Sequence, residues 1–254
     1  TYLHSFGVPL EKTFAVPNAP GFSIDAMTIA DVESRRSGER NGPLRLLYMG
    51  RLDRQKGIDR VYGTIAQLRD RNVVFEAVIV GGEILADSPS TWTARLKELG
   101  CDVRAPVFSS RELTKLLAWG DVLLMPSRWE GAPLIIAEAQ QLGCVPIATA
   151  VGAVGELIIH GENGLLVDQR SDAEIVEHMA QAVLGVARDR QRLRLLAKGC
   201  LETAAQRSWT ASFSAFLDWC TAMNPASPQP QASALPRAEQ ASGARPKTSA
   251  EIIS

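Results

Sequence analysis

The stretch PSRWEGAPLIIAEA, residues 126–139, places two glutamates where a carboxylate needs a chemical reason. Pro133 fits the first turn of a helix, where its missing N–H costs nothing. In such a helix Leu134 and Glu138 share one face, so Glu138 points where apolar side chains point. Glu130 lies in the loop that enters the same helix. A buried carboxylate needs a partner: a hydroxyl-rich ligand would serve, and so would solvent or a neighbouring arginine.

A second segment able to do chemistry is GRLDRQKG, residues 50–57, which follows an apolar run and precedes a predicted helix. Its two glycines allow close approach of the backbone, and Arg51 and Lys56 add positive charge. Next to a helix N-terminus, these features favour a bound phosphate. The spacing matches neither G-x-G-x-x-G nor a Walker loop, so a solvated basic loop with a glycine at the helix entry remains the alternative.

Small residues mark two further strand ends. Gly81 follows an apolar run and would leave the edge of a sheet free of side chains, although a plain turn explains it equally well. Gly131 and Ala132 lie in the entry loop of the predicted helix, with free amides directed along the helix dipole. Histidine and cysteine form no cluster with metal-ligand spacing, so we expect neither a metal site nor a cofactor.

Apolar runs and helical periodicity alternate through the middle of the chain. Strands are predicted at 44–50, 75–82, 103–108, 121–127 and 145–150. Helices are predicted at 57–70, 91–99, 133–142, 154–159 and 172–222. One more helix should begin at the capping box formed by Ser109 and Glu112. Continuous apolar strands alternating with helices indicate an α/β fold, a Rossmann-like, doubly wound parallel sheet. The carboxyl ends of such strands share one edge, and ligands bind there. We therefore expect both glutamates and the basic loop to meet at that edge.

The chain divides into four regions that differ in amino-acid composition and in the periodicity of apolar residues. Residues 1–42 are predicted to be a connector that ends in a polar loop, 43–190 the Rossmann-like domain, and 191–223 C-terminal helices. Residues 224–254 are rich in Pro, Ala and Ser and have almost no large apolar side chains. Such a tail cannot bury enough surface to offset the entropy of ordering it, so we expect it to be disordered.

Composition narrows the class of protein. The 254 residues are 46% hydrophobic with a net charge of −1, so no global field attracts nucleic acid. The four cysteines are scattered, which is typical of reduced thiols, and no apolar run reaches the length of about 18 residues that a membrane span requires. We expect a cytoplasmic protein. The chain starts without Met, which suggests a piece of something longer.

Four motifs together resemble a known family. GRLDRQKG, VGG, EGAPLIIAEA and GAVGELIIHGENGLLV occur in the order and at the spacings of the C-terminal, donor-binding half of the family-4 retaining glycosyltransferases of the two-Rossmann-domain GT-B type. The resemblance covers roughly residues 1–190. It implies a nucleotide-sugar donor and sugar transfer with retention, in which the leaving phosphate takes the proton of the acceptor. It implies no divalent metal.

The resemblance also implies roles for single residues. Arg51 and Lys56 would hold the donor diphosphate and neutralise the leaving group. Glu130 would bind the hydroxyls of the donor sugar, and Glu138 those of the ribose. The remaining donor contacts would come from Gly50, Gly81, Gly131, Ala132 and Leu134, with the base near Val107.

Departures from the family pattern leave alternatives open. Asn18-Ala19 stands where the family commonly has Asn-Gly, and Gly152-Ala153-Val154-Gly155 where some members have adjacent glycines. The N-terminal, acceptor-binding domain is missing, and any peripheral membrane contact would belong to that half. The aromatic residues of the stretch 209–222 would then form an exposed patch or pack on their own domain.

Three functions compete. The first is half of a glycosyltransferase, complete only with an N-terminal partner. The second is a nucleotide-binding module that keeps the donor pocket without turnover. The third is another enzyme of this fold, an epimerase or a phosphorylase, for which the acid–base residues or the pyridoxal lysine are not evident.

Overall fold

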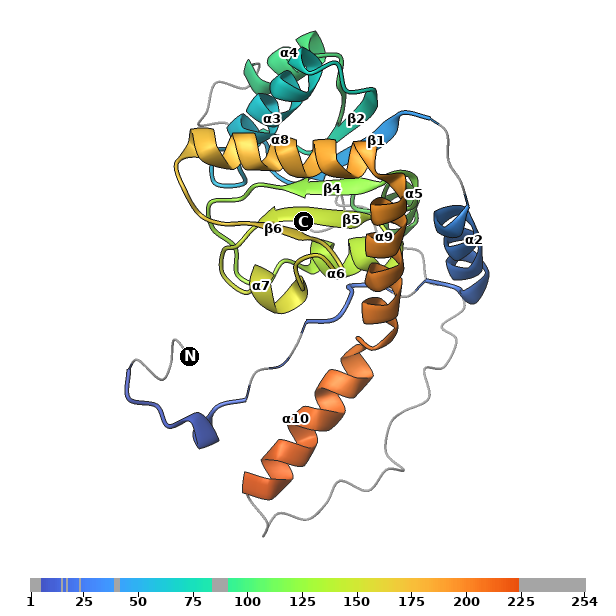
Figure 1. Ribbon diagram of the computed structural model, residues 1–254. Helices are drawn as coiled ribbons and strands as arrows, with labels where there is room; N and C mark the ends of the chain where they lie inside the picture. The colour runs from blue at the N-terminus through green and yellow to red at the C-terminus, as the bar shows by residue number, and fades with distance from the viewer. Residues whose placement is uncertain are drawn as a thin grey trace, which may run out of the picture.

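The computed structural model describes residues 6–14, 16, 18–22, 24–38, 42–83 and 91–223. The predicted disordered tail, 224–254, lies outside these residues. In the described part the chain forms a single sheet covered by helices on both faces (Figure 1).

All six strands of the sheet are parallel and follow the order β3-β2-β1-β4-β5-β6. Their bounds are β1 Leu44–Met49, β2 Phe75–Val80, β3 Asp102–Arg104, β4 Val122–Met125, β5 Val145–Thr149 and β6 Leu165–Val167. The strand order reverses direction between β1 and β4, which makes this the switch point of a doubly wound sheet. The predicted Rossmann-like α/β fold is confirmed.

Helices connect the strands. They are α2 Ala26–Ser37, α3 Ile58–Asp70, α4 Thr91–Glu98, α5 Ser110–Trp119, α6 Leu134–Gln141, α7 Val154–Leu157, α8 Asp172–Arg188, α9 Arg190–Ala205 and α10 Trp209–Met223, with a 3-10 turn, η1, at Leu10–Lys12. The predicted stretch 172–222 is thus three helices. Asp189 lies between the first two and caps α9 by accepting a hydrogen bond from the backbone N–H of Arg192 at 2.9 Å.

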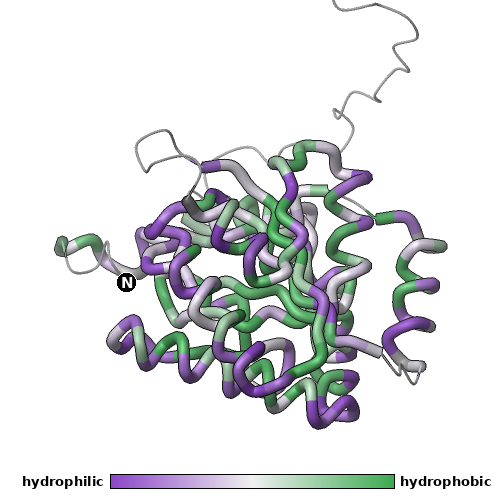
Figure 2. The backbone as a smooth tube through the Cα atoms, turned by 90° about the horizontal axis from the view of Figure 1, so that it is seen from above, coloured by the Kyte–Doolittle hydropathy of each residue, from purple (hydrophilic) through white to green (hydrophobic). Residues whose placement is uncertain are grey.

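The two faces of the sheet carry separate cores. Leu46 and Tyr48 of β1 face the layer that contains α3, α4 and α8, whereas Leu47 faces α5, α6 and α2. Figure 2 shows hydrophobic segments gathered in the strands at the centre, while the outer helices alternate between hydrophobic and hydrophilic turns. Because both faces are covered, the strands are apolar on both sides, as the continuous runs in the sequence predicted. Leu196 and Cys200 of α9 are buried in the first of these cores.

Three local expectations are wrong. The polar run from residue 33 was expected to be a loop, but it continues α2, which Asp25 caps by accepting the Thr28 N–H at 2.8 Å. The strand predicted at 103–108 ends at Arg104, before Pro106, which has no N–H to donate to a ladder. Ser109 is the N-cap of α5, but its side chain makes no capping hydrogen bond.

The last helix, α10, extends away from the sheet (Figure 1). Phe14 of the N-terminal segment contacts the rings of Phe216 and Trp219, with centroids 5.8 and 5.6 Å away. Trp209 donates its indole N–H to the carbonyl of Pro20 at 2.9 Å. Phe213 is 56% exposed. The predicted aromatic stretch therefore packs partly on residues of its own chain and is partly exposed.

Candidate functional site

The loops that follow β1 and β4 meet at the switch point of the sheet. The Lys56 ammonium lies 2.8 Å from both carboxylate oxygens of Glu130. Ser127 donates its hydroxyl to one of these oxygens at 2.7 Å. Glu130 is only 6% exposed. The structure thus joins two of the predicted residues in a partly buried ion pair, with a serine as a third member that the sequence reasoning missed.

A glycine allows the two loops to approach this closely. Gly57, the N-cap of α3, has a φ of 75° in the left-handed region. A Cβ at this position would lie 2.1 Å from the carbonyl oxygen of Pro126 in the other loop. Within the first loop, the Asp53 carboxylate accepts the backbone N–H of Lys56 at 2.8 Å. Gly57 therefore sets the distance between the lysine loop and the glutamate loop.

Arg51 shares the loop with Lys56 but is paired within it. Its Nε lies 2.8 Å from the Asp53 carboxylate, and it donates to the Gln55 side-chain oxygen at 2.9 Å. Tyr48 fixes the backbone by donating its hydroxyl to the Arg51 carbonyl at 2.6 Å. Burial and then the negative charges of Asp53 and Glu130 raise the pKa of Tyr48 far above its usual value, so the hydroxyl remains a donor.

Several of the residues predicted to contact the donor are glycines, which bring backbone segments close together near this site. A Cβ on Gly81 would lie 1.8 Å from the Gly50 carbonyl oxygen, so these two strand ends touch directly. Gly131 faces open space, with no atom within 4 Å of a Cβ built there. Behind it, a Cβ on Gly152 would lie 1.9 Å from the Glu130 carbonyl oxygen. The loop after β5 therefore packs directly against the backbone of the loop that contains Glu130.

Glu138 is 8% exposed on α6 and faces the connector. The backbone N–H of Gly21 donates to its carboxylate at 3.3 Å, and no ion pair joins it to a cation within the described residues. Burial raises the pKa of Glu138, and the Gly21 hydrogen bond lowers it in part. Nearby, Asn18 donates its side-chain amide to the Ala132 carbonyl at 2.7 Å, and Leu134 is partly exposed.

Val107 lies apart from this group. It follows β3, which is separated from β1 by β2, and it packs partly buried against the core on the α5 side. Its predicted contact with a base stays a prediction.

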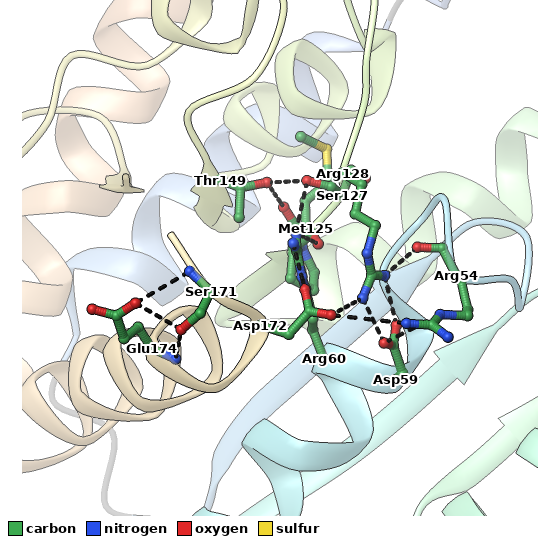
Figure 3. A network of polar contacts seen from close by, with 11 residues as sticks. Arg54, Asp59, Arg60, Met125, Ser127, Arg128, Thr149, Ser171, Asp172 and Glu174 are labelled. Carbon is green, nitrogen blue, oxygen red and sulfur yellow. Dashed lines mark hydrogen bonds and ion pairs between the residues drawn. The ribbon is translucent and has the colours of Figure 1, made fainter. Parts of the chain in front are cut away.

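A network of charged side chains connects the two loops to α3 and α8 (Figure 3). The sequence reasoning missed this network. Arg60 of α3 is buried and donates to the Pro126 carbonyl at 3.0 Å and the Ser127 carbonyl at 3.3 Å. Its other end contacts the Asp172 carboxylate at 2.7 Å. Thr149 donates its hydroxyl to the same Ser127 carbonyl at 2.5 Å. The backbone just before Glu130 is therefore fixed by side chains of α3, β5 and α8.

Arg128 completes the network. Its guanidinium lies 2.6 Å from both the Asp59 and the Asp172 carboxylates, and it also donates to the Arg54 carbonyl. Burial alone would raise the pKa of Asp59, but the hydrogen bonds and charge of Arg128 lower it. The Arg128 hydrogen bond likewise lowers the pKa of Asp172. The sequence analysis did not single out Arg128, although its position in the run PSRWEG, after a strand and just before Glu130, is a signal that could have pointed to it.

A family model for glycosyl transferases of group 1 matches residues 30–195, a stretch that contains both loops, the network and α6. The chain belongs to the group 1 glycosyl transferases. The predicted resemblance to glycosyltransferases of the GT-B type is thereby confirmed.

Curated members of this family are moderately similar. The D-inositol 3-phosphate glycosyltransferase of Corynebacterium aurimucosum is 31% identical over 171 residues, which cover 65% of this chain and 40% of the relative. The glycogen synthase of Mycobacterium tuberculosis H37Rv is 28% identical over 182 residues, or 72% of this chain and 41% of the relative. This glycosyl transferase chain thus spans about two fifths of the length of these relatives.

Solved structures share the fold. Alr3699/HepE of Anabaena, determined in complex with UDP, superposes with a TM-score of 0.66 at 19% identity over 86% of this chain and 60% of that one. The C-terminal domain of the group 1 glycosyl transferase LpcC from Francisella tularensis has a TM-score of 0.55 at 22% identity, over 74% of this chain and 94% of that one. The second match agrees with the predicted C-terminal half of a two-domain fold.

The described residues contain neither a candidate metal site nor a helix that could span a membrane. Within the described ranges of this glycosyl transferase chain, no three His, Cys, Asp or Glu side chains gather so that they could hold a metal ion. In that same part of the chain, no helix is long and apolar enough to cross a membrane.

Proposed function

We propose that this chain binds a nucleotide-diphosphate sugar and forms the donor-binding half of a glycosyltransferase that transfers the sugar with retention. The observation that supports this most strongly is the partly buried Lys56–Glu130 pair at the switch point of the sheet, beside the open space at Gly131. A cation and a carboxylate in contact there offer one group to a diphosphate and the other to a polyol. Family membership supports the same reading.

The diphosphate would lie over the lysine loop. Lys56 and Arg51 supply positive charge, and the amides after Glu130 would meet the distal phosphate in the space that Gly131 leaves open. Charge accumulates on the diphosphate as the sugar leaves, so cations and amides fixed in advance stabilise the transition state more than the ground state. The departing phosphate would take the proton of the acceptor hydroxyl, which requires no enzymic nucleophile.

The two carboxylates would bind the two polyol ends of the donor. Glu130 accepts hydrogen bonds from Lys56 and Ser127 and has lone pairs left for sugar hydroxyls. Within the part of the chain that the structure describes, Glu138 accepts one hydrogen bond, from the backbone N–H of Gly21. Two vicinal ribose hydroxyls would satisfy this buried carboxylate, which explains why an acid stands on the apolar face of α6.

The whole reaction would need more than this chain. Because the chain spans about two fifths of its curated relatives, we propose that transfer requires an acceptor-binding part like that which makes up the rest of a two-domain enzyme. We further propose that the protein works in the cytoplasm without a metal or organic cofactor. The free cysteines Cys101, Cys144 and Cys200, all buried, are compatible with a reducing compartment.

The test is thermal unfolding of this chain with UDP, GDP and ADP. A nucleotide at a hundred times its dissociation constant adds about 2.7 kcal/mol, which raises Tm by about 5–10 °C at this size. Arg51→Ala and Glu138→Ala should lose that shift. Arg188→Ala, which removes an exposed arginine at the end of α8, should keep it. A shift that survives both site variants, or no shift with any nucleotide, would contradict the proposed donor site.

A second measurement separates binding from transfer. The purified chain with a donor sugar and added acceptors should show nucleotide binding and no turnover. Turnover by the chain alone would overturn the requirement for an acceptor-binding part. Binding that never supports transfer, even after fusion to the acceptor domain of a relative, would favour the nucleotide-binding module instead.

A further inference from the structure

A second concave site lies at the opposite edge of the sheet, where the strands begin. It is a cavity of about 340 Å³ bounded by α2, the start of β1, the turn before β5 and the first turns of α9. Figure 1 shows α2 and α9 beside this end of the sheet. Lys56 and Glu130 follow the carboxyl ends of the strands, so this cavity is separate from the proposed donor site.

The lining of this cavity is strongly basic. Among the described residues it contains five arginines and one acid, Asp121: the arginines are Arg35, Arg36, Arg45, Arg190 and Arg194. Asp121 is already paired with Arg36 at 3.0 Å, and both side chains are largely buried. The lining therefore has a formal excess of four positive charges, whereas the whole chain has a net charge of −1. Such a concentration of like charge raises the local concentration of anions.

Arg36 has a structural role and Arg35 is paired with Asp31 at 3.1 Å, whereas Arg190 and Arg194 of α9 have donors left over. Arg36 donates to the Gly120 carbonyl at 2.5 Å and to the Leu142 carbonyl at 3.2 Å, which ties α2 to the sheet. Arg190 donates one N–H to the Gly42 carbonyl at 2.9 Å, and a guanidinium has five. Arg194 is one turn further along α9, and no ion pair joins it to an acid within the described ranges.

Arg45 adds charge to the cavity but is held by neighbours outside its lining. Its Nε lies 3.7 Å from the Glu76 carboxylate, and its guanidinium lies 5.4 Å from the centroid of the Trp119 ring. That Nε is closed to solvent, so it contributes positive charge to the cavity and no donor of its own.

We propose that this arginine cavity binds a multiply charged phosphate-class oxyanion, either a free phosphate compound or the phosphate of a lipid headgroup. Guanidinium groups recognise phosphate through paired N–H donors, and several arginines around one cavity match an anion with several oxygens. The site needs no nucleotide, so it stands whether or not the donor proposal holds.

The test uses inorganic tripolyphosphate and isothermal titration calorimetry. All measurements are made in an Arg51→Ala background, which weakens competing binding at the donor loop. The double variant Arg190→Gln/Arg194→Gln should bind tripolyphosphate at least tenfold more weakly. The single variant Arg188→Gln, an exposed arginine just before α9, should bind unchanged. Binding of UDP to the double variant without the Arg51 change should also be unchanged.

A second arm identifies the source of the phosphate. Phosphatidylcholine vesicles with phosphatidic acid should sediment the protein if the ligand is a lipid headgroup, and vesicles of phosphatidylcholine alone should not. A free phosphate ligand predicts calorimetric binding without sedimentation. If the double variant unfolds, Arg35→Gln on the exposed side of α2 replaces it. The proposal is overturned if neither probe binds, or if binding is equal in the arginine variants and in Arg188→Gln at equal Tm.

Discussion

Replacing Gly57 by alanine tests the idea that this glycine sets the contact between the two loops of the site. Two penalties apply. The φ of 75° is left-handed, which costs a residue with a Cβ about 1–2 kcal/mol. The new Cβ would also lie 2.1 Å from the Pro126 carbonyl oxygen, whereas ordinary contact begins at 3.4 Å. One backbone segment must therefore move by roughly 1 Å.

The expected loss of stability follows from these two penalties. Forcing atoms into a packed site costs about 1–3 kcal/mol, so Gly57→Ala should lose about 2–5 kcal/mol in all. Gly161→Ala is the matched control, because Gly161 has a φ of 84° and no atom within 4 Å of a Cβ. It should lose only the backbone part, about 1–2 kcal/mol. The difference between the two variants isolates the clash with the glutamate loop.

Urea unfolding of both variants measures these losses, and binding of a nucleoside diphosphate gives a second readout. The clash pushes the loop that contains Lys56 away from the loop that contains Glu130. Gly57→Ala should therefore weaken binding even where it remains folded, whereas Gly161→Ala should not. Equal losses of stability in both variants would refute the claimed contact. Unchanged binding in a folded Gly57→Ala protein would refute its link to the site.

Three further predictions concern the charges of the site. Burial raises the pKa of Glu138 in the folded state, so its charge costs stability at pH values above that raised pKa. Glu138→Gln should therefore raise Tm at pH 7 and weaken nucleotide binding; the gain in Tm should shrink as the pH falls through the raised pKa and be gone below the unfolded value of 4.5. Lys56→Met leaves buried Glu130 without its cation and should cost about 1–3 kcal/mol in urea unfolding, against no loss for Lys198→Met on the exposed surface of α9. Arg128→Gln removes the partner that lowers the pKa of Asp59 in the folded state. The wild type gains stability from this ion pair above the unfolded pKa and loses it as the pH falls through the folded pKa. The stability of the variant should therefore depend less on pH in an acid titration.

The strands and the edge that holds the site could be predicted, because both follow from local sequence. Short continuous apolar runs that end in glycine are typical of strands covered on both faces, and parallel strands bring their carboxyl ends together. In the structure Glu130 lies in the loop after β4, and Glu138 lies buried on the helix that follows. The pairing of Lys56 with Glu130 was not predicted, because it joins residues 74 positions apart and depends on which strands are neighbours.

The helix α2 shows why the rest could not be predicted. Its charged, polar sequence contains only one fully buried apolar side chain, Val32, so periodicity gives little signal. What fixes the helix is tertiary: Arg36 donates to backbone carbonyls that α5 and α6 present at their C-terminal ends. The network of Arg60 and Arg128 has the same character. Charged residues that look solvated in the sequence become structural once the loops meet.

The two glutamates that stand out in the sequence differ in how the fold treats their charge. Glu130 is paired with a lysine and accepts a hydrogen bond from a serine of the same chain, so its burial costs little before a ligand arrives. Among the described residues Glu138 has one backbone N–H and no cation, so its charge is left partly uncompensated. A diphosphate that attracted Lys56 would loosen the first pairing, while the hydroxyls of the same ligand would complete the second. One donor would therefore satisfy both carboxylates at once, and a ligand with only one of these chemical groups would satisfy neither fully.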